Sequence, residues 1–402
     1  MSTEARTSIA THRRLAGATV LQLISDFGNE IRLRRIADTA AALQRTGARC
    51  MVAGPAETAP QPFGGVEWIA LRPSGLNVFA FRRNVRRLEM ILTSERVDIV
   101  HAYSAATAWS ALAATDTLPV WVVTTLPESI PSRWSPGGHL QAALARGDHV
   151  IAHSSLAAGT MMRRAGLAAD RVTVIPHAID AHLFDPASMR PERVLALRRA
   201  WQVPQGDRVI LVPGPIAPTG GQDVLVQAVR KLPPRLIADV TFMLMGDASQ
   251  NARFARRLAR DIRETKLDRH IRFAGPCRDW PAAIAASDLV VMPTREPLLF
   301  GRPIPESQAM ARPVIASAVG ILPENLLAPP RIAENLRTGW LVRPGDAADL
   351  TAALHQALSL DIGGYRALVA RARQFAEFMF SPQSTVASVL GVYGRLLSGE
   401  TK

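Results

Sequence analysis

Residues 208–229 have the sequence RVILVPGPIAPTGGQDVLVQAV. An apolar run from Val209 to Val212 leads into a loop rich in glycine and proline, and a helix-like segment follows. This order predicts a phosphate-binding turn of an α/β sheet, because glycines let backbone N–H groups approach an anion and the N-terminus of a helix attracts it. The loop contains no Arg or Lys, although the chain has 47 such residues.

The same alternation of strand-like and helix-like segments covers most of the chain and falls into two blocks. The strand-like runs are continuously apolar, which is typical of parallel sheets covered on both faces. Such alternation predicts right-handed crossovers between parallel strands. We therefore expect an α/β protein with two Rossmann-like, doubly wound domains that face each other across a cleft, where ligands bind at the carboxyl ends of the strands.

The domain boundaries follow from this pattern. We expect an N-terminal domain at residues 1–185, a C-terminal domain at 186–375, and a helical segment at 376–402 that packs back on the N-terminal domain. The proline-broken residues 171–192 predict an irregular connector between the domains. The segment HLQAALARGD, residues 139–148, is expected to be helical.

The composition is that of a globular protein, since 48% of the 402 residues are hydrophobic and 20% are charged. No apolar run reaches membrane-spanning length, and the polar N-terminus lacks the pattern of a signal peptide. Cys50 and Cys277 lie far apart in the sequence, which predicts neither a disulfide nor a zinc site. We expect a cytoplasmic protein that binds no metal.

The net charge of +13 comes almost wholly from arginine. A basic protein can bind nucleic acid, anionic lipid surfaces or anionic small molecules. The sequence contains no recognisable nucleic-acid module, and its aromatic residues do not alternate with arginines as a base-stacking surface requires. Nucleic acid is therefore not an expected partner.

Two predicted helices carry clusters of arginine. The segment FRRNVRRLEM, residues 81–90, places four arginines beside an apolar stripe. It is either a solvated helix face over a core or a peripheral contact with anionic lipid at the inner face of a membrane. Its arginines are Arg82, Arg83, Arg86 and Arg87. The segment ARFARRLARDIRETK, residues 252–266, is expected to expose its arginines to solvent.

An ordered set of motifs gives the chain a resemblance to a known family. The motifs are VTVIPHAID (172–180), LMGD (244–247), FGRPIPESQAMARPVIAS (300–317) and TGWLVRPGDAADLTAAL (338–354). Together they resemble the retaining glycosyltransferases of the GT-B fold, family 4, also called group 1 glycosyl transferases. The resemblance implies transfer of a hexose from a nucleotide diphosphate sugar to a lipid-linked or cell-envelope polysaccharide acceptor, with no cofactor beyond that donor.

The resemblance also assigns a donor site on the second domain. Residues expected to contact the nucleotide sugar are Gly28, Gly214, Gly220, Gly221, Gly246, Arg302 and Glu306. In the family an Arg and a Lys in the glycine loop bind the diphosphate, and these positions hold Pro215 and Gly220 here. Arg302 is the expected replacement for the two missing cations, because a departing diphosphate needs positive charge.

Other family positions are also changed. Glu306 matches the glutamate that holds the ribose, or it complements the dipole at the start of a helix. Leu298 stands where the family has a glutamate at the donor sugar, and Glu296, two positions earlier, is the alternative candidate. Leu126 stands where a histidine is expected. His101 is the remaining candidate catalytic histidine, and its alternative role is structural.

These departures leave two main functions open. The first is a glycosyltransferase with an atypical donor site. The second is a catalytically impaired pseudo-glycosyltransferase that acts as a binding or scaffold protein. An adaptor that uses the arginine-rich helices is a third possibility. The base, sugar and acceptor are not determined by the sequence.

Overall fold

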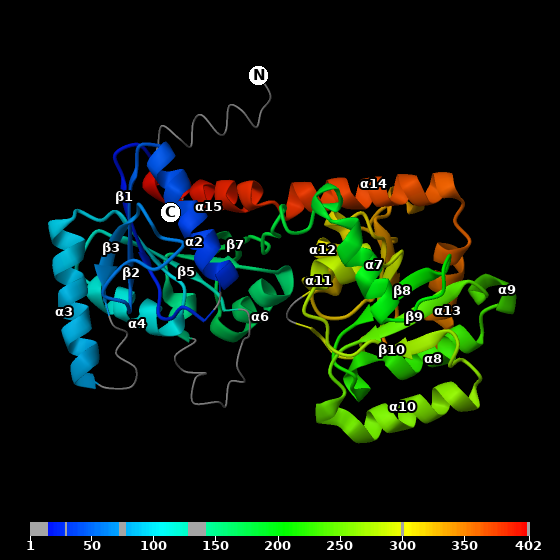
Figure 1. The fold of residues 1–402 in the computed structure, drawn as a ribbon. Coiled ribbons are helices and arrows are strands. Elements are labelled where there is room, and N and C mark those ends of the chain that lie inside the picture. Colours follow the sequence, from blue (N-terminus) through cyan, green and yellow to red (C-terminus); the bar gives the residue numbers. More distant parts are fainter. Residues whose placement is uncertain (1–14, 29, 72–77, 128–141, 299–300, 400–402) are drawn as a thin grey trace. The chain divides into compact units, whose positions relative to one another are not determined.

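The computed structural model describes residues 15–28, 30–71, 78–127, 142–298 and 301–399. Contacts divide the chain into two compact units (Figure 1). Unit 1 comprises residues 1–178 and 382–402, and unit 2 comprises residues 179–381. The divisions thus fall at 178 and 381, whereas the sequence pattern placed them at 185 and 375. Each unit is built on a parallel sheet with helices packed against it, as predicted.

In the described part of unit 1, seven parallel strands form a sheet in the order β3-β2-β1-β4-β5-β6-β7. The strands are β1 Thr19–Leu23, β2 Arg49–Gly54, β3 Glu67–Ala70, β4 Ile99–Ala102, β5 Trp121–Thr125, β6 His149–Ala152 and β7 Val172–Val174. The chain runs outward from β1 to β3 and then returns to the other side of β1 with β4. The loops after β1 and β4 therefore meet at a switch point, where doubly wound sheets bind their ligands.

Helices cover both faces of the unit 1 sheet. They are α2 Glu30–Arg45, α3 Val78–Ser94, α4 Ala105–Ala114, α6 Ser155–Ala165 and α15 Pro382–Leu397. Val20 and Leu21 are consecutive in β1 and point to opposite faces, as strand geometry requires. Val20 packs in one hydrophobic cluster with α2 and α15. Leu21 packs in another with α3 and α4.

Two local predictions were correct only in part. The boundary between the two units, at residue 178, does fall within the segment predicted as a connector. The segment predicted as an irregular connector begins with β7, which pairs with β6 through Thr173 and Ile151. This edge strand has only three residues before the chain meets Pro176, so its sequence shows no alternation. Within the segment predicted as a helix at 139–148, residues Ala142–Arg146 form a short 3-10 helix, η1, and residues 139–141 lie outside the described part.

In the described part of unit 2, six parallel strands lie in the order β10-β9-β8-β11-β12-β13. The strands are β8 Arg208–Pro213, β9 Val240–Met245, β10 Ile271–Phe273, β11 Leu289–Met292, β12 Val314–Ser317 and β13 Gly339–Val342. The direction of the strand order again reverses, here between β8 and β11. The loop that opened the sequence analysis follows β8 and so lies at this second switch point.

The unit 2 sheet is also covered on both faces. Its helices are α7 Pro191–Ala200, α8 Gln222–Arg230, α9 Pro234–Ile237, α10 Ala252–Glu264, α11 Trp280–Ala285, α12 Pro303–Ala309, α13 Ala347–Leu358 and α14 Ile362–Met379. One hydrophobic cluster joins the sheet to α8, α10 and α13. A second cluster joins it to α11, α12 and the end of α14. Strand β8 and helix α8 fix the two ends of the glycine loop that joins them (residues 214–221, the β8–α8 loop).

Candidate functional site

The loops after β8, β9 and β11 approach one another at the carboxyl edge of the unit 2 sheet, and glycines permit the approach. A Cβ on Gly221 would lie 1.9 Å from the carbonyl oxygen of Pro293, and φ at Gly221 is +72°. A Cβ on Gly246 would lie 1.8 Å from the carbonyl oxygen of Gly214. Any side chain at these two positions would overlap backbone atoms. The glycines predicted to approach a diphosphate therefore also serve close packing of the loops.

Several N–H groups of these glycines already have partners in the protein. Three donate to backbone carbonyls: Gly214 to Met245 (3.0 Å), Gly220 to Ala217 (2.9 Å) and Gly246 to Gly275 (3.1 Å). The start of α8 is different, because its N-cap residue Gly221 has no side chain to bond the first-turn N–H groups. An anion at this loop would therefore interact mainly with the N-terminus of α8 and less with the N–H groups of the glycines.

A basic side chain from another segment contacts the β8–α8 loop. Arg295, in the loop after β11, donates its backbone N–H to the carbonyl of Thr219 at 2.9 Å. Its Nη2 lies 2.8 Å from Oδ2 of Asp223 in the first turn of α8. Arg295 was not predicted from the sequence, although its place three positions after the apolar run Leu289–Met292 marks it as a switch-point residue. The loop thus has a nearby positive charge, which Asp223 partly neutralises.

The side chains of Glu306 and Arg302 form an ion pair. The Glu306 side chain is 2% exposed. Its Oε1 accepts from Nε and Nη2 of Arg302 at 3.0 and 2.7 Å, and its Oε2 accepts from Nε1 of Trp280 at 2.5 Å. Burial raises the pKa of the Glu306 carboxyl, and the Arg302 charge and the two donors lower it in part. In this arrangement both carboxylate oxygens are bonded within the protein, and the Arg302 charge is paired.

Leu298, at the family's glutamate position, and Glu296, the candidate to replace that glutamate, differ in their surroundings. Glu296 is exposed, and its backbone carbonyl accepts from Oγ1 of Thr294 at 3.3 Å. Leu298 is half-buried against the second hydrophobic cluster of unit 2, and its carbonyl accepts from the N–H of Ile321. Glu296 therefore remains the candidate carboxylate, and its position is open to solvent.

His101 lies inside unit 1. The residue is 1% exposed, its Nδ1 lies 2.6 Å from Oη of Tyr393, and its Nε2 lies 2.7 Å from Oγ1 of Thr125. Burial, with a smaller effect of the Arg35 charge, holds its pKa well below the usual value. Both ring nitrogens are therefore used within the core, which favours the structural role. Leu126, at the position where a histidine was expected, is also buried in the core.

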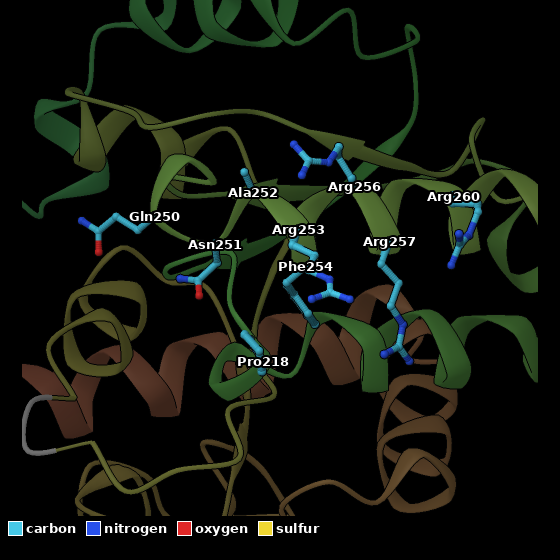
Figure 2. Close-up of a pocket in the computed structure, with 9 residues that line it drawn as sticks. All are labelled: Pro218, Gln250, Asn251, Ala252, Arg253, Phe254, Arg256, Arg257 and Arg260. Carbon is cyan, nitrogen blue, oxygen red and sulfur yellow. The ribbon is translucent and has the colours of Figure 1, made fainter.

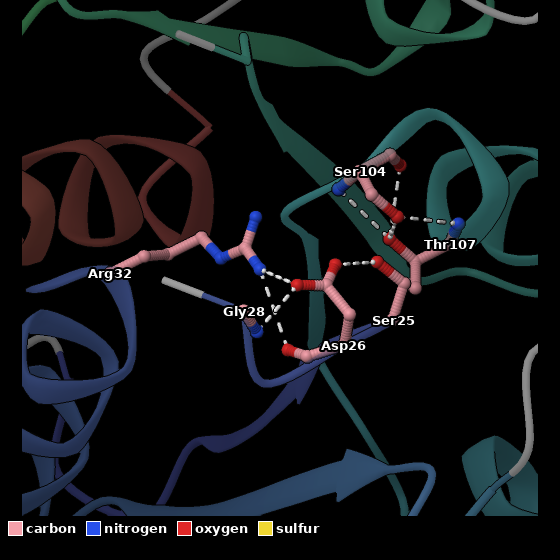
Figure 3. A network of polar contacts seen from close by, with 6 residues as sticks. All are labelled: Ser25, Asp26, Gly28, Arg32, Ser104 and Thr107. Atoms are coloured by element: carbon pink, nitrogen blue, oxygen red, sulfur yellow. Dashed lines mark hydrogen bonds and ion pairs between the residues drawn. The ribbon is translucent and has the colours of Figure 1, made fainter. Parts of the chain in front are cut away.

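A polar network surrounds the loop after β1 at the switch point of unit 1 (Figure 3). Asp26 accepts from Oγ of Ser25 at 2.9 Å, from the N–H of Gly28 at 3.0 Å and from Nη2 of Arg32 at 2.6 Å. Partial burial raises the pKa of Asp26, but these donors and the Arg32 charge lower it overall. The Gly28 N–H, predicted to approach the donor, is thus bonded to Asp26. Asp26 and Arg32 lie six positions apart in the sequence, and their ion pair was not predicted from it.

The described residues form neither a metal-binding cluster nor a membrane-spanning helix. No three His, Cys, Asp or Glu side chains in that part of the chain gather as a metal site requires. The described helices lack an apolar stretch of the length that a transmembrane span requires. Cys50 and Cys277 are free thiols, and burial raises the pKa of Cys50 to about 12.

Two family models match the chain, one in each half. The family described as Glycosyltransferase Family 4 matches residues 34–183. The family described as Glycosyl transferases group 1 matches residues 207–359. The first match falls almost wholly in unit 1, and the second falls in unit 2.

Whole-chain comparisons agree with these matches. A D-inositol 3-phosphate glycosyltransferase of Salinispora tropica is 28% identical over 344 residues, which cover 79% of this chain and 68% of that protein. The crystal structure of a glycosyltransferase from Rickettsia africae is similar with a TM-score of 0.73 and 26% identity, over 95% of this chain and 99% of that one.

A further similar structure is that of Anabaena HepE in complex with UDP-glucose, at 23% identity and a TM-score of 0.62, over 93% of this chain and 98% of that one. At this identity the likeness shows the fold alone. The chain is therefore similar to glycosyltransferase family 4 over residues 34–183 and to the group 1 glycosyl transferases over residues 207–359, and it has the GT-B fold.

Proposed function

We propose that the chain is a glycosyltransferase that moves a hexose from a nucleotide diphosphate sugar to a lipid-linked or cell-envelope polysaccharide acceptor, with retention of configuration at the sugar. The observation that carries this proposal is the pair of matches to glycosyltransferase families at residues 34–183 and 207–359. The UDP-glucose bound to HepE supports a nucleotide sugar as the donor. The family motifs quoted above support the retaining reaction.

Stabilisation of the leaving diphosphate is the chemical requirement of this reaction. Negative charge grows on the diphosphate as the sugar leaves, and oriented N–H groups and cations must compensate it. A helix N-terminus such as that of α8 contributes about 0.3–1 kcal/mol at an exposed site, and a charge-assisted hydrogen bond about 1.5–3 kcal/mol. Arg295 is close enough to the β8–α8 loop to add its positive charge to the attraction of the α8 N-terminus for an anion. We expect a slow enzyme.

A second candidate function is that of a catalytically impaired GT-B protein that binds a ligand or serves as a scaffold. Pro215 and Gly220 remove both cations of the family loop. The Glu306 carboxylate, which binds ribose in the family, is bonded to Trp280 and Arg302 instead. These observations favour loss of turnover without loss of the fold.

A nucleotide screen separates the two functions. Unfolding temperatures of the full chain are measured with UDP, GDP, ADP and their glucose or mannose derivatives. A nucleotide at a hundred times its Kd adds about 2.7 kcal/mol to the stability of the folded chain. A shift together with slow release of sugar from the donor supports the transferase. A shift without any sugar release over days supports the impaired protein, and no shift with any nucleotide contradicts the transferase.

Restoring one cation sharpens this experiment. A Cβ on Gly220 would lie 2.7 Å from the carbonyl oxygen of Pro215, so a lysine cannot return there without moving the loop. Pro215→Arg adds a cation without that overlap, and Pro215→Gln is the uncharged control. If the diphosphate lies against this loop, the Arg variant binds UDP more tightly than the Gln variant. Equal affinity of the two variants would place the diphosphate elsewhere.

We also infer that α3 contacts an anionic membrane surface at its cytoplasmic side. Phe79 and Met90 are 83% and 64% exposed. Spacings of three and four residues place both on one face of α3 with two of the arginines between them. These arginines are Arg83 and Arg86. Large apolar side chains that flank positive charges are typical of helices that lie in a membrane interface.

Vesicle flotation tests this contact. We expect the full chain to float with vesicles that contain phosphatidylglycerol and to remain in solution with phosphatidylcholine alone. Replacing Phe79 and Met90 by Ser, or the four α3 arginines by Gln, should abolish flotation. The matched control replaces four exposed arginines of α10 by Gln and should still float. Flotation that survives both α3 variants would rule out this helix as the contact.

A further inference from the structure

Helix α10 has its apolar residues on one side and its arginines on another. Leu258 and Ile262 are buried in the first hydrophobic cluster of unit 2. Four exposed arginines follow the spacing i, i+3, i+4 and i+7, which brings them together along one side of the helix: Arg253, Arg256, Arg257 and Arg260. Like charges at these spacings repel one another, so the helix alone gains nothing from this arrangement.

The arginines line a groove between α10 and the β8–α8 loop. Its volume is about 800 Å³. We call it the α10 groove and define it by Pro218, Asn251 and the four arginines named above. Figure 2 shows Arg253 and Arg257 extending from α10 to the side on which Pro218 lies, and Arg256 extending to the other side. Pockets for small molecules commonly measure about 300–1,000 Å³, so the groove has room for a ligand of nucleotide size.

The positive charge in the groove is weakly compensated. Arg257 and Arg260 each have a carboxylate on the next turn, Asp261 and Glu264, at 3.8 Å. These pairs are exposed and long, and such pairs hold a guanidinium weakly. Among the described residues, Arg253 and Arg256 have no acidic group within ion-pair distance. The guanidinium groups are therefore available to an anion from solution.

We propose that the α10 groove binds a ligand that carries at least two neighbouring phosphate groups. A guanidinium presents parallel N–H donors that match two phosphate oxygens, so adjacent arginines hold adjacent phosphates. The amide of Asn251 adds a polar group at the end of the groove that lies nearest the start of α10. This inference goes beyond the proposed function, because it holds whether or not the chain transfers a sugar.

The same observations disfavour two other anionic partners. No large apolar side chain among the described residues of α10 is exposed, in contrast to Phe79 and Met90 on α3, so α10 lacks the groups that insert into lipid. Phe254 is the one aromatic residue of α10, and it is half-buried against the core. It also lines the groove, but a single ring does not provide the series of aromatic side chains on which the successive bases of a nucleic acid stack.

Calorimetry with inorganic tripolyphosphate on the full chain tests the proposal. The double variant Arg253→Gln and Arg257→Gln removes two guanidiniums and keeps the helix-forming side-chain stems. We expect it to bind tripolyphosphate at least about tenfold more weakly, since each charge-assisted contact is worth that much or more. Arg263→Gln is the matched control, because Arg263 is exposed on the same helix outside the groove, and it should bind like the parent chain. Equal unfolding temperatures confirm that the variants are folded.

The same measurement with UDP shows which kind of molecule supplies the phosphates. If UDP displaces tripolyphosphate and the double variant weakens both, the ligand is the nucleotide diphosphate itself. If UDP binding is unchanged in the double variant, the ligand is a separate oligophosphate. The proposal is overturned if the parent chain does not bind tripolyphosphate, or if the double variant and Arg263→Gln lose affinity equally. The proposal is also overturned if the parent chain binds RNA or phosphatidylglycerol vesicles in place of tripolyphosphate and the double variant loses that binding.

Discussion

Gly221 lies where α8 begins and where the loop after β11 comes nearest to the β8–α8 loop. Its φ of +72° belongs to the left-handed region, which side chains other than glycine rarely adopt. The overlap of an added Cβ with the Pro293 carbonyl oxygen is a separate obstacle. One residue thus meets a torsional and a steric requirement together, and both arise from the close approach of backbones at the switch point.

Gly221→Ala is expected to lower the free energy of unfolding by about 3 kcal/mol or more, because backbone strain of about 1–3 kcal/mol adds to the overlap with Pro293. Gly206→Ala is the matched control, since Gly206 also has a positive φ but no atom within 4 Å of an added Cβ. Its expected cost is about 1 kcal/mol. Urea unfolding of both variants measures the difference, and equal costs would show that the loop after β11 yields to the methyl group.

Single residues also show how far the site can be inferred from the sequence. The position of Glu306 in its motif marks it as important, but its bond to Trp280 depends on folding that joins residues 26 positions apart. The same holds for Arg295, which meets Asp223 only because β8 and β11 are neighbours in the sheet. Motifs identify the residues of such a site, whereas sheet topology decides which of them become partners.

A chain of buried polar side chains joins α15 and α2 to the unit 1 sheet. His101 of β4 contacts Tyr393 of α15 and Thr125 of β5. His153, directly after β6, lies 3.4 Å from Nη1 of Arg35 on α2, and its Nδ1 lies 3.0 Å from the carbonyl of Ile175. Burial lowers the pKa of both histidines well below the usual value, and the Arg35 charge lowers them further.

This arrangement predicts that unit 1 becomes less stable as the pH falls below about 6.5, the pKa of an unfolded histidine. Below that pH the unfolded chain binds protons that the folded chain does not bind, so each histidine costs about 1.4 kcal/mol per pH unit. Urea unfolding between pH 7.5 and 5.5 measures the slope. His101→Gln should reduce it, because one of the two buried histidines is then absent. An unchanged slope in His101→Gln would contradict the assignment.

Elements were predictable from the sequence in proportion to their length and periodicity. The long apolar runs of β1 and β8 and the helical spacing in α2 and α10 each give a signal of their own. The three residues of β7 do not, and they become a strand because β6 offers an unpaired edge. The short helix η1 likewise forms where the chain turns toward β6. Tertiary pairing thus decides the short elements.

Unit 2 is formed by one continuous segment of the chain, whereas the core of unit 1 also needs a segment from the C-terminal end. The chain enters unit 2 at residue 179, completes it by residue 381 and then returns to unit 1. Helix α15 supplies a row of apolar side chains to the core of unit 1: Val386, Val389, Leu390, Tyr393 and Leu396. Burial of one such side chain contributes about 1.5–3 kcal/mol. The row therefore contributes as much as the net stability of an ordinary domain, about 5–15 kcal/mol.

Fragments of the chain test this dependence. Residues 179–381 contain all the strands of their own sheet, so we expect this fragment to fold alone and unfold cooperatively in urea. Residues 1–178 lack α15 and leave apolar surface of the unit 1 sheet uncovered, so they should remain unfolded or aggregate. Adding a synthetic peptide of residues 382–402 should restore a cooperative transition, and a peptide with Leu390→Ser and Tyr393→Ser should not. A cooperative transition of residues 1–178 alone would mean that α15 covers a core already complete without it.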